Sequence, residues 1–329
     1  MIWNGKKVLV TGAGGFIGSH LTERLVREGA QVTAFVRYNS RGDRGSLKFL
    51  PQEILSEIKV EVGDLKDPFA AQKIARKQEI VFHLAALIGI PYSYVNPIDY
   101  VQTNALGTSY LLQACREENI EKFIHTSTSE VYGTAQYVPI DENHPLQGQS
   151  PYSASKIAAD QMALSFHRAF EMPVAVIRPF NTYGPRQSAR AVIPTIIYQG
   201  LKSDRIKLGS LSPKRDLNFV GDTVEGFIRM AESPKSIGEV INVGSSKEIT
   251  IGELAEKISG LLGKQQEVVG DSDRVRPKAS EVGRLQADIQ KAKEILNWEP
   301  RTSLTEGLTQ TIEWVKEQMS FFPDDSYQV

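Results

Sequence analysis

A tyrosine and a lysine four positions apart, Tyr152 and Lys156, are suited to moving protons. They follow Pro151, which favours the first turn of a helix, so the spacing predicts that both side chains lie on one helix face. A phenol titrates at about 10, and a group that exchanges protons near neutral pH needs a shift of about three units, on the order of 4 kcal/mol. The neighbouring ammonium could supply part of that shift. Taken alone, the pair also fits an ordinary exposed helix, where these residue types are common.

A second group of polar residues, Thr128, Ser129 and Glu130, lies about two dozen positions upstream. It follows an apolar stretch, residues 123–126, that predicts a buried strand. The sequence from 126 to 156 therefore contains the groups needed to move a hydride and protons. Glu130 could be a catalytic base, or it could be a structural residue that pairs with an arginine.

A glycine-rich turn near the start of the chain predicts a site for a dinucleotide. It lies between an apolar stretch, residues 8–10, and an amphipathic stretch, residues 19–28, that predicts a helix. Glycines permit a tight turn, a close approach of backbone N–H groups to a pyrophosphate at the positive end of the helix, and close packing of helix and strand. An ordinary strand-to-helix turn is the alternative. The residues expected to bind the cofactor here are Gly12, Gly15, Phe16, Ile17 and Gly18.

The second predicted strand, residues 32–36, ends at Arg37. Dinucleotide-binding folds often carry an acidic residue there for the adenosine ribose. Arg37, with Arg41 and Arg44, could instead meet a 2′-phosphate and so favour NADP, or these residues could form a solvated basic loop.

Residues 60–65 and 80–86 predict the third and fourth strands. Asp64 could accept a hydrogen bond from an adenine amino group, or it could cap the following helix. Small residues at the end of the fourth strand would let a cofactor lie against the backbone, whereas His83 is expected to be a core histidine with its hydrogen bonds satisfied. The cofactor contacts expected from these strand ends are Asp64, Leu65, Leu84, Ala85 and Ala86.

The order of the predicted elements indicates an α/β fold, a Rossmann-type doubly wound parallel sheet with a smaller C-terminal substrate lobe. We expect residues 1–180 to form the dinucleotide-binding domain. Residues 181–329, in which prolines interrupt short elements, are expected to form mainly the substrate lobe, with 239–243 as a candidate strand that returns to the main sheet. Within the first domain, residues 99–117 predict a helix whose Asn104 needs hydrogen-bond partners if it is buried.

Composition argues against several classes of protein. The net charge is −1 over 329 residues, and acids and bases are interspersed. The sequence therefore does not indicate the basic surface that binds nucleic acid or an anionic membrane. No apolar run approaches the roughly 20 residues that a bilayer span requires. Cys115 is the single cysteine, and the N-terminus lacks the apolar stretch of a signal peptide, so we expect a cytoplasmic protein without disulfides. We also expect no metal site.

The motifs in combination resemble the extended short-chain dehydrogenase/reductase family over nearly the whole chain. The motifs that carry the resemblance are Gly12-x-x-Gly15-x-x-Gly18, Asp64-Leu65, His83-Leu84-Ala85-Ala86, Asn104, Ser127-Thr128, Tyr152-x-x-x-Lys156 and Arg178-Pro179-x-Asn181-x-Tyr183-Gly184-Pro185. The resemblance implies NAD as the cofactor, with NADP as the alternative, and a nucleotide sugar as the substrate. It implies that Tyr152 is the base toward the sugar 4-hydroxyl, that Lys156 binds the cofactor ribose and lowers the pKa of the tyrosine, and that Thr128 hydrogen-bonds the reacting oxygen. The helices that hold Asn104 and Tyr152 resemble those that pair in homodimers of the family.

Within that family, residues 128–133 are similar to the nucleotide-sugar 4,6-dehydratases. In this reaction, oxidation at C4 acidifies the C5 proton, which Glu130 would remove. The 6-hydroxyl then leaves as water, and the hydride returns to C6. The dTDP-glucose branch has Asp-Glu where this chain has Ser129-Glu130, so Glu130 would also have to deliver the proton it took. The chain is more similar to the GDP-mannose and UDP-N-acetylglucosamine dehydratases, and residues 38–40 and 273–284 most resemble the UDP-N-acetylglucosamine enzymes of legionaminic-type pathways.

The resemblance also implies how the substrate would be held. Arg215 and Arg276 could clamp the diphosphate bidentately, and Asn181 and Ser129 could bind nearby. Two other functions compete with the dehydratase. One is a C4 or C5 epimerase of the same family, and the other is a non-catalytic dinucleotide-sensing binding protein. The presence of Thr128, Tyr152 and Lys156 argues against the latter.

Overall fold

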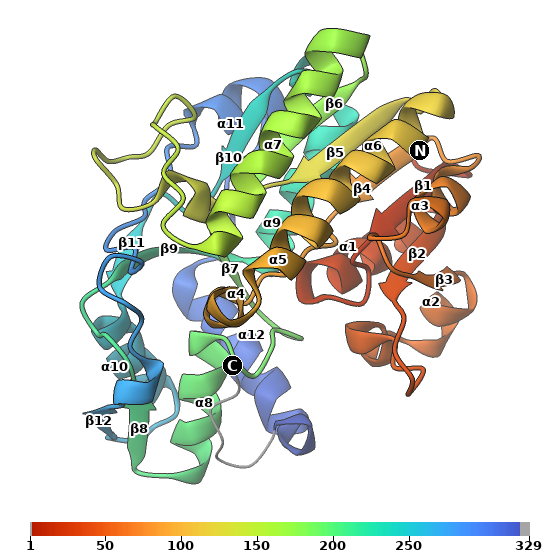
Figure 1. Cartoon of the computed structure of the whole chain (residues 1–329). Coiled ribbons are helices and arrows are strands. Elements are labelled where there is room, and N and C mark those ends of the chain that lie inside the picture. The colour runs from red at the N-terminus through yellow and green to blue at the C-terminus, as the bar shows by residue number, and fades with distance from the viewer. Residues whose placement is uncertain (1, 323–329) are drawn as a thin grey trace.

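A seven-stranded sheet forms the centre of the computed structural model, which describes residues 2–322 (Figure 1). The predicted lobe's last seven residues, 323–329, lie outside the described residues. All neighbouring strands of the sheet run parallel, in the order β10-β6-β5-β4-β1-β2-β3, which confirms the doubly wound Rossmann-type fold. The strands are β1 (Lys7–Thr11), β2 (Gln31–Arg37), β3 (Lys59–Gly63), β4 (Ile80–His83), β5 (Lys122–Thr126), β6 (Val174–Pro179) and β10 (Val240–Val243).

Helices cover both faces of this sheet because its buried strands alternate their side chains between two cores. In β1, for example, Val8 and Val10 belong to one core and Leu9 to the other. The first core is completed by α1 (Phe16–Arg27) and α9 (Val220–Glu232). The second is completed by α3 (Pro68–Ala75), α6 (Gly107–Glu117) and α7 (Pro151–Phe170).

A smaller lobe, at the bottom of Figure 1, has a third apolar core of its own. It contains a three-stranded sheet in the order β11-β9-β7 and a two-stranded sheet of β12 and β8. The strands are β7 (Asn181–Tyr183), β8 (Arg205–Leu208), β9 (Lys214–Phe219), β11 (Glu248–Thr250) and β12 (Glu267–Gly270). The helices that pack on them are α8 (Val192–Lys202), α10 (Ile251–Leu261) and α12 (Leu304–Glu317).

Short helices and turns connect these layers. They are η1 (Gly45–Phe49), α2 (Gln52–Ser56), α4 (Ile90–Val95), α5 (Pro97–Tyr100), the π-helical turn η2 (Val101–Leu106), η3 (Ser129–Tyr132), η4 (Pro234–Ser236), η5 (Ser272–Arg274), α11 (Gln290–Leu296) and η6 (Met319–Phe321). No helix within residues 2–322 is long and apolar enough to cross a lipid bilayer.

The main sheet draws on residues far beyond position 180. Strand β10 pairs in parallel with β6, with Ile241 opposite Ile177, and α9 contributes Phe227 to the first core. The candidate strand at residues 239–243 therefore corresponds to β10 at the edge of the main sheet.

Two predicted elements differ from the observed ones. The fourth strand ends at His83, and the chain then leaves the sheet as a loop. The helix expected over residues 99–117 is divided into α5, the π turn and α6. Both differences involve Asn104, whose side chain accepts a hydrogen bond from the Leu87 N–H (2.8 Å) and donates to the Leu87 carbonyl (2.9 Å). This long-range contact holds the loop against the π turn.

Candidate active site

The predicted site residues gather where the parallel strands of the main sheet end, the usual ligand-binding edge of such sheets. The glycine turn follows β1, Leu84 follows β4, and Thr128 follows β5. Helix α7 begins beside the same edge, so Tyr152 and Lys156 come from its first two turns.

The glycine turn packs tightly against the segment after β4. Gly12 has a φ of +71°, and a Cβ there would lie 2.7 Å from the Ala85 nitrogen. A Cβ on Gly18 would lie 2.2 Å from the Gly12 carbonyl oxygen. Gly15 is the extended N-cap of α1 and offers no side-chain cap, so the N–H groups at the start of this helix point to the end of the sheet without an intrahelical acceptor. The two segments expected to hold a cofactor therefore meet, and this cradle fits a dinucleotide.

The basic loop after β2 lies against the glycine turn. The Ser46 N–H donates to the Gly14 carbonyl (2.8 Å), and Asn39 orders the loop by accepting hydrogen bonds from the N–H groups of Arg41 (3.1 Å) and Asp43 (2.9 Å). Arg37 is exposed at the end of β2 and opposes Gly63 of β3. The loop therefore borders the place where the adenosine end of a dinucleotide would lie in this fold.

Asp64, at the end of β3, does not cap the next helix. Its Oδ1 accepts from the Lys66 N–H (3.0 Å), whereas Asp67 is the N-cap of α3 and accepts from the Phe69 N–H (2.9 Å). The capping alternative for Asp64 is therefore wrong, because the cap is Asp67, three residues later. Leu65 is buried in the second core, so its side chain packs there.

Tyr152 and Lys156 are buried, with exposed fractions of 7% and 4%, so the alternative of an ordinary exposed helix is wrong. Ser150 caps α7 by accepting from the Ser153 N–H in a capping box, which fixes the first turn. The Lys156 ammonium donates to the Thr126 carbonyl at the end of β5 (2.6 Å). Burial lowers the pKa of Lys156 to about 8, and the carboxylate of Asp160 opposes this shift.

The expected lowering of the Tyr152 pKa by Lys156 is not observed in the protein alone. Burial raises the pKa of the phenol, and the Thr128 hydroxyl opposes this rise only in part. The negative charge of Glu130 raises the pKa further, because Glu130 lies close to the tyrosine.

Thr128, Ser129 and Glu130 share one tight turn. Thr128 is the N-cap of η3 and its Oγ1 accepts from the Glu130 N–H (3.2 Å). Ser129 and Glu130 are 2% and 9% exposed. Within the described part of the chain, Glu130 has no basic group within ion-pair distance, but its charge acts on the buried Arg215 guanidinium, so the structural alternative of pairing with an arginine stays open. This turn therefore presents a buried carboxylate beside a buried phenol.

The substrate side of the site contains two arginines held by one acid. Arg215, on β9, donates to Glu281 Oε1 (3.1 Å), and the Arg276 guanidinium lies 3.8 Å from the same oxygen. Burial lowers the pKa of Arg215, and the charges of Glu130 and Glu281 oppose that shift, which puts Arg215 between the two acids.

Two buried polar atoms on this side, Arg276 Nη1 and Asn181 Oδ1, form no hydrogen bond with the described residues. Both are therefore able to bond a polar ligand. Our prediction included both arginines but not Glu281. The sequence signal that could have identified Glu281 is that it closely follows Arg276 in the chain.

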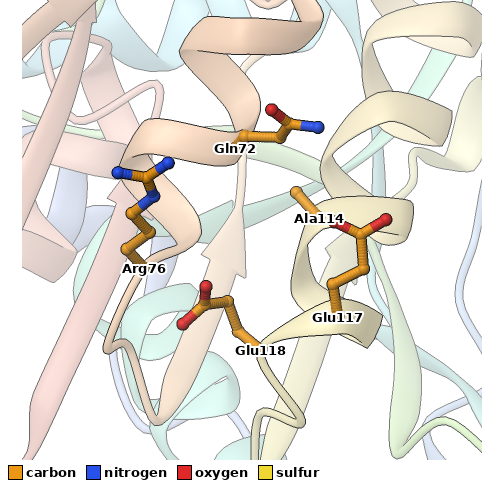
Figure 2. Close-up of a pocket in the computed structure, with 5 residues that line it drawn as sticks. All are labelled: Gln72, Arg76, Ala114, Glu117 and Glu118. Atoms are coloured by element: carbon orange, nitrogen blue, oxygen red, sulfur yellow. The ribbon is translucent and has the colours of Figure 1, made fainter.

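A separate cavity lies at the opposite edge of the sheet. Figure 2 shows its lining at the ends of α3 and α6, which precede the starts of β4 and β5. The lining residues are Gln72, Arg76, Ala114, Glu117 and Glu118. None of the predicted site residues lines it. Among residues 2–322, no cluster of His, Cys, Asp and Glu side chains could hold a metal ion.

A parallel Rossmann-type sheet with a glycine turn after β1, and a buried tyrosine-lysine pair beside a threonine at a strand end, define an extended short-chain dehydrogenase/reductase. More narrowly, the chain belongs to the GDP-mannose 4,6 dehydratase family, whose model matches residues 9–311.

Relatives within this family differ in their reactions. The chain is 32% identical to a putative UDP-glucose 4-epimerase of Methanocaldococcus jannaschii, over 94% of this chain and 98% of that protein. It is also 32% identical to a dTDP-glucose 4,6-dehydratase of Streptomyces antibioticus, over 96% and 94%. Among solved structures, the dTDP-glucose 4,6-dehydratase DesIV of Streptomyces venezuelae, with NAD bound, matches with a TM-score of 0.86 and 27% identity, over 96% of this chain and 98% of DesIV.

Proposed function

We propose that this protein is an NAD-dependent nucleotide-sugar 4,6-dehydratase that acts on UDP-N-acetylglucosamine. The observation that carries the proposal is Glu130, a buried carboxylate that forms no ion pair among the described residues, lies in the same turn as Thr128, and is close enough to Tyr152 for its charge to raise the pKa of the phenol. Epimerisation at C4 needs no such base, whereas elimination of water does. The choice of sugar nucleotide rests on the resemblance of residues 38–40 and 273–284.

Each step can be assigned to a residue of this chain. Tyr152 takes the proton of the C4 hydroxyl while Thr128 hydrogen-bonds that oxygen, and Glu130 takes the C5 proton made acidic by the new ketone. Glu130 then gives this proton to the departing 6-hydroxyl, which leaves as water, and C5 gains one proton in place of the one that Tyr152 took from the C4 hydroxyl. The turn of Gly12, Gly15 and Gly18 would hold NAD, which would supply the hydride acceptor for C4 and the hydride donor for C6. The product is a 4-keto-6-deoxy sugar nucleotide, with no net oxidation.

A C4 or C5 epimerase of the same family is the second candidate, and the C5 reaction would also use a base for the C5 proton. Thr128, Tyr152 and Lys156 serve the initial oxidation equally well in both reactions, and a relative of equal identity is named a UDP-glucose 4-epimerase. A dinucleotide-sensing protein without turnover is the third candidate.

Mass spectrometry separates these three candidates. The purified protein is incubated with UDP-, GDP- and dTDP-sugars, with NAD and with NADP in parallel, because Arg37 and its basic loop border the cofactor cradle. We expect UDP-N-acetylglucosamine to lose the mass of one water with NAD. Isomerisation at constant mass would instead identify an epimerase, and the absence of any turnover would leave only a binding role.

We expect Arg276→Ala to weaken the binding of the nucleotide sugar about 10- to 100-fold, because a charge-assisted hydrogen bond to the diphosphate is lost. Binding of NAD should be retained, since the glycine turn is on the other side of the site. Isothermal titration with each ligand measures both affinities. Lys278→Ala, which removes a charge from the same segment, is the matched control. An unchanged affinity for the sugar nucleotide in the Arg276 variant would refute the role.

We further propose a homodimer formed by the helices that hold Asn104 and Tyr152. These helices and the π turn expose apolar side chains, including Val101 (47%), Leu106 (45%) and Met162 (36%). Light scattering is expected to give twice the mass of one chain, and Leu106→Glu should shift the protein toward the mass of a single chain. A monomeric mass for the unaltered protein would contradict the proposal.

A further inference from the structure

Behind the catalytic pair lies a cluster of buried polar side chains that takes no part in the proposed chemistry. At its centre is Asp160, one helical turn after Lys156 on the same face of α7. Every member of the cluster is less than a tenth exposed. The members are His125, Ser127, Tyr132, Asp160, Arg178 and Asn242.

The Asp160 carboxylate is fixed by three groups, from β5, from the residue after β5, and from β6. Its Oδ2 accepts from the Ser127 hydroxyl (2.6 Å) and from Arg178 Nη2 (3.0 Å). Its Oδ1 lies 3.2 Å from His125 Nε2. Although burial acts the other way, these contacts keep the pKa of Asp160 below its usual value, so the group is a carboxylate. Burial lowers the pKa of His125 to about 4, so this histidine is neutral and donates from Nε2, and its buried Nδ1 has no hydrogen-bond partner in the part of the chain that the structure describes.

Arg178 extends the network to the far end of the catalytic turn. Its NH1 donates to the Tyr132 hydroxyl (2.9 Å), which donates to Asn242 Oδ1 on β10 (2.8 Å). Tyr132 is the last residue of η3, and Ser127 directly precedes Thr128. The segment that carries Thr128 and Glu130 is therefore anchored to Asp160 at both ends, directly at Ser127 and through Arg178 at Tyr132.

We propose that Asp160 is a positioning residue that holds the turn with Thr128 and Glu130 in register with the helix that carries Tyr152 and Lys156, while its charge keeps Lys156 in the ammonium form. The proposal rests on the proposed function and adds to it a residue that contacts neither substrate nor cofactor. A purely structural role explains the cluster less well, because buried ion pairs can often be replaced by apolar side chains without loss of stability.

The charges around Lys156 give the proposal a pH signature. The titratable groups that interact with it are Asp160 on its own helix, His83 on β4 and His125 on β5. Burial lowers the pKa of both histidines, so they are neutral near pH 7, and Asp160 supplies the negative charge that opposes the loss of the Lys156 proton. Lys156 is charged below its pKa of about 8. Without the Asp160 charge this pKa falls further, so the ammonium is lost at a lower pH.

The test compares Asp160→Asn with Ser127→Ala. The Asn variant should lose about 100-fold in kcat, the scale expected for misplaced reacting groups, with KM for the nucleotide sugar unchanged. The alkaline limb of its pH-rate profile should move about one unit toward lower pH, the effect expected for removing a nearby opposite charge. Ser127→Ala breaks one anchor without changing a charge, so its kcat should fall while its alkaline limb stays in place. If Asp160→Asn does not fold, kcat and the alkaline limb of the pH-rate profile are measured in Ser127→Ala and in Asp160→Glu, which keeps the charge. These two variants then test the positioning role.

A second measurement does not depend on turnover. The Nζ resonance of Lys156, followed by NMR in lysine-labelled protein and assigned by its loss in Lys156→Met, should titrate at lower pH in Asp160→Asn than in the unaltered protein. Lowered thermal stability with unchanged kcat, alkaline limb and Nζ titration would reduce Asp160 to a structural residue and overturn the proposal. If the unaltered protein turns over no nucleotide sugar, the proposed function fails, and the Nζ titration alone still tests Asp160.

Discussion

Glu130→Gln is expected to abolish the elimination of water while leaving oxidation at C4 in place. Glutamine has nearly the same shape but cannot take the C5 proton, and loss of a general base typically costs 10²- to 10⁴-fold in rate, so we expect water loss to slow by roughly that factor. The substitution removes a negative charge that acts on the buried Arg215 guanidinium, but Arg215 keeps its ion pair with Glu281 (3.1 Å). The structural cost should therefore be small.

Two signals separate the steps in this variant. Absorbance of the reduced cofactor reports oxidation at C4, and mass spectrometry reports loss of water from the sugar nucleotide. In the Gln variant the reduced cofactor should accumulate, because the hydride has no acceptor at C6 until water has left. Oxidation thus serves as the internal control for a folded site. Full formation of the dehydrated product by the Gln variant would eliminate Glu130 as the base.

Tyr152→Phe is expected to slow the first oxidation by about 10²- to 10⁴-fold, the usual effect of losing a group that transfers a proton. Binding of NAD should persist, because the Lys156 ammonium is held by the Thr126 carbonyl and does not depend on the phenol. Burial raises the pKa of Tyr152, so the substitution removes a neutral hydroxyl rather than a charge. Single-turnover formation of reduced cofactor is the direct measurement.

Tyr100→Phe provides a matched control for this variant. Tyr100 is buried, packs edge-on against Tyr152 with ring centroids 6.3 Å apart, and donates its hydroxyl to the Gly89 carbonyl. It therefore reports the cost of losing a buried tyrosine hydroxyl without the chemistry. Equal rates in the two variants would show that Tyr152 acts only by packing.

Local patterns sufficed to predict the glycine turn and the Tyr152-Lys156 pair. In both cases the spacing along one turn or one helix decides the geometry, so the chain needs no distant partner to define it. The sheet was predictable for a similar reason, because buried parallel strands appear as short apolar runs between helical segments.

The remaining features depend on contacts between distant parts of the chain. Asn104 in the π turn bonds the backbone of Leu87, 17 positions away, and no helical pattern contains that contact. Burial of Tyr152 raises its pKa more than its neighbours lower it, which only the packed site reveals. Glu281 bridges the two arginines only because β9 and the segment after η5 meet in the fold.

The position of β10 has a consequence for the synthesis of the protein. Translation delivers β1 to β6 early, yet the strand that completes the sheet, and α9 on its face, follow much later. Until residue 243 has left the ribosome, β6 presents an open hydrogen-bonding edge, a known template for aggregation. The nascent nucleotide-binding half cannot complete its sheet until β10 has been synthesised. Its open edge must be shielded until then, because β10 is encoded in the second half of the gene. For the same reason, dividing the chain at residue 180 would not yield two independent halves.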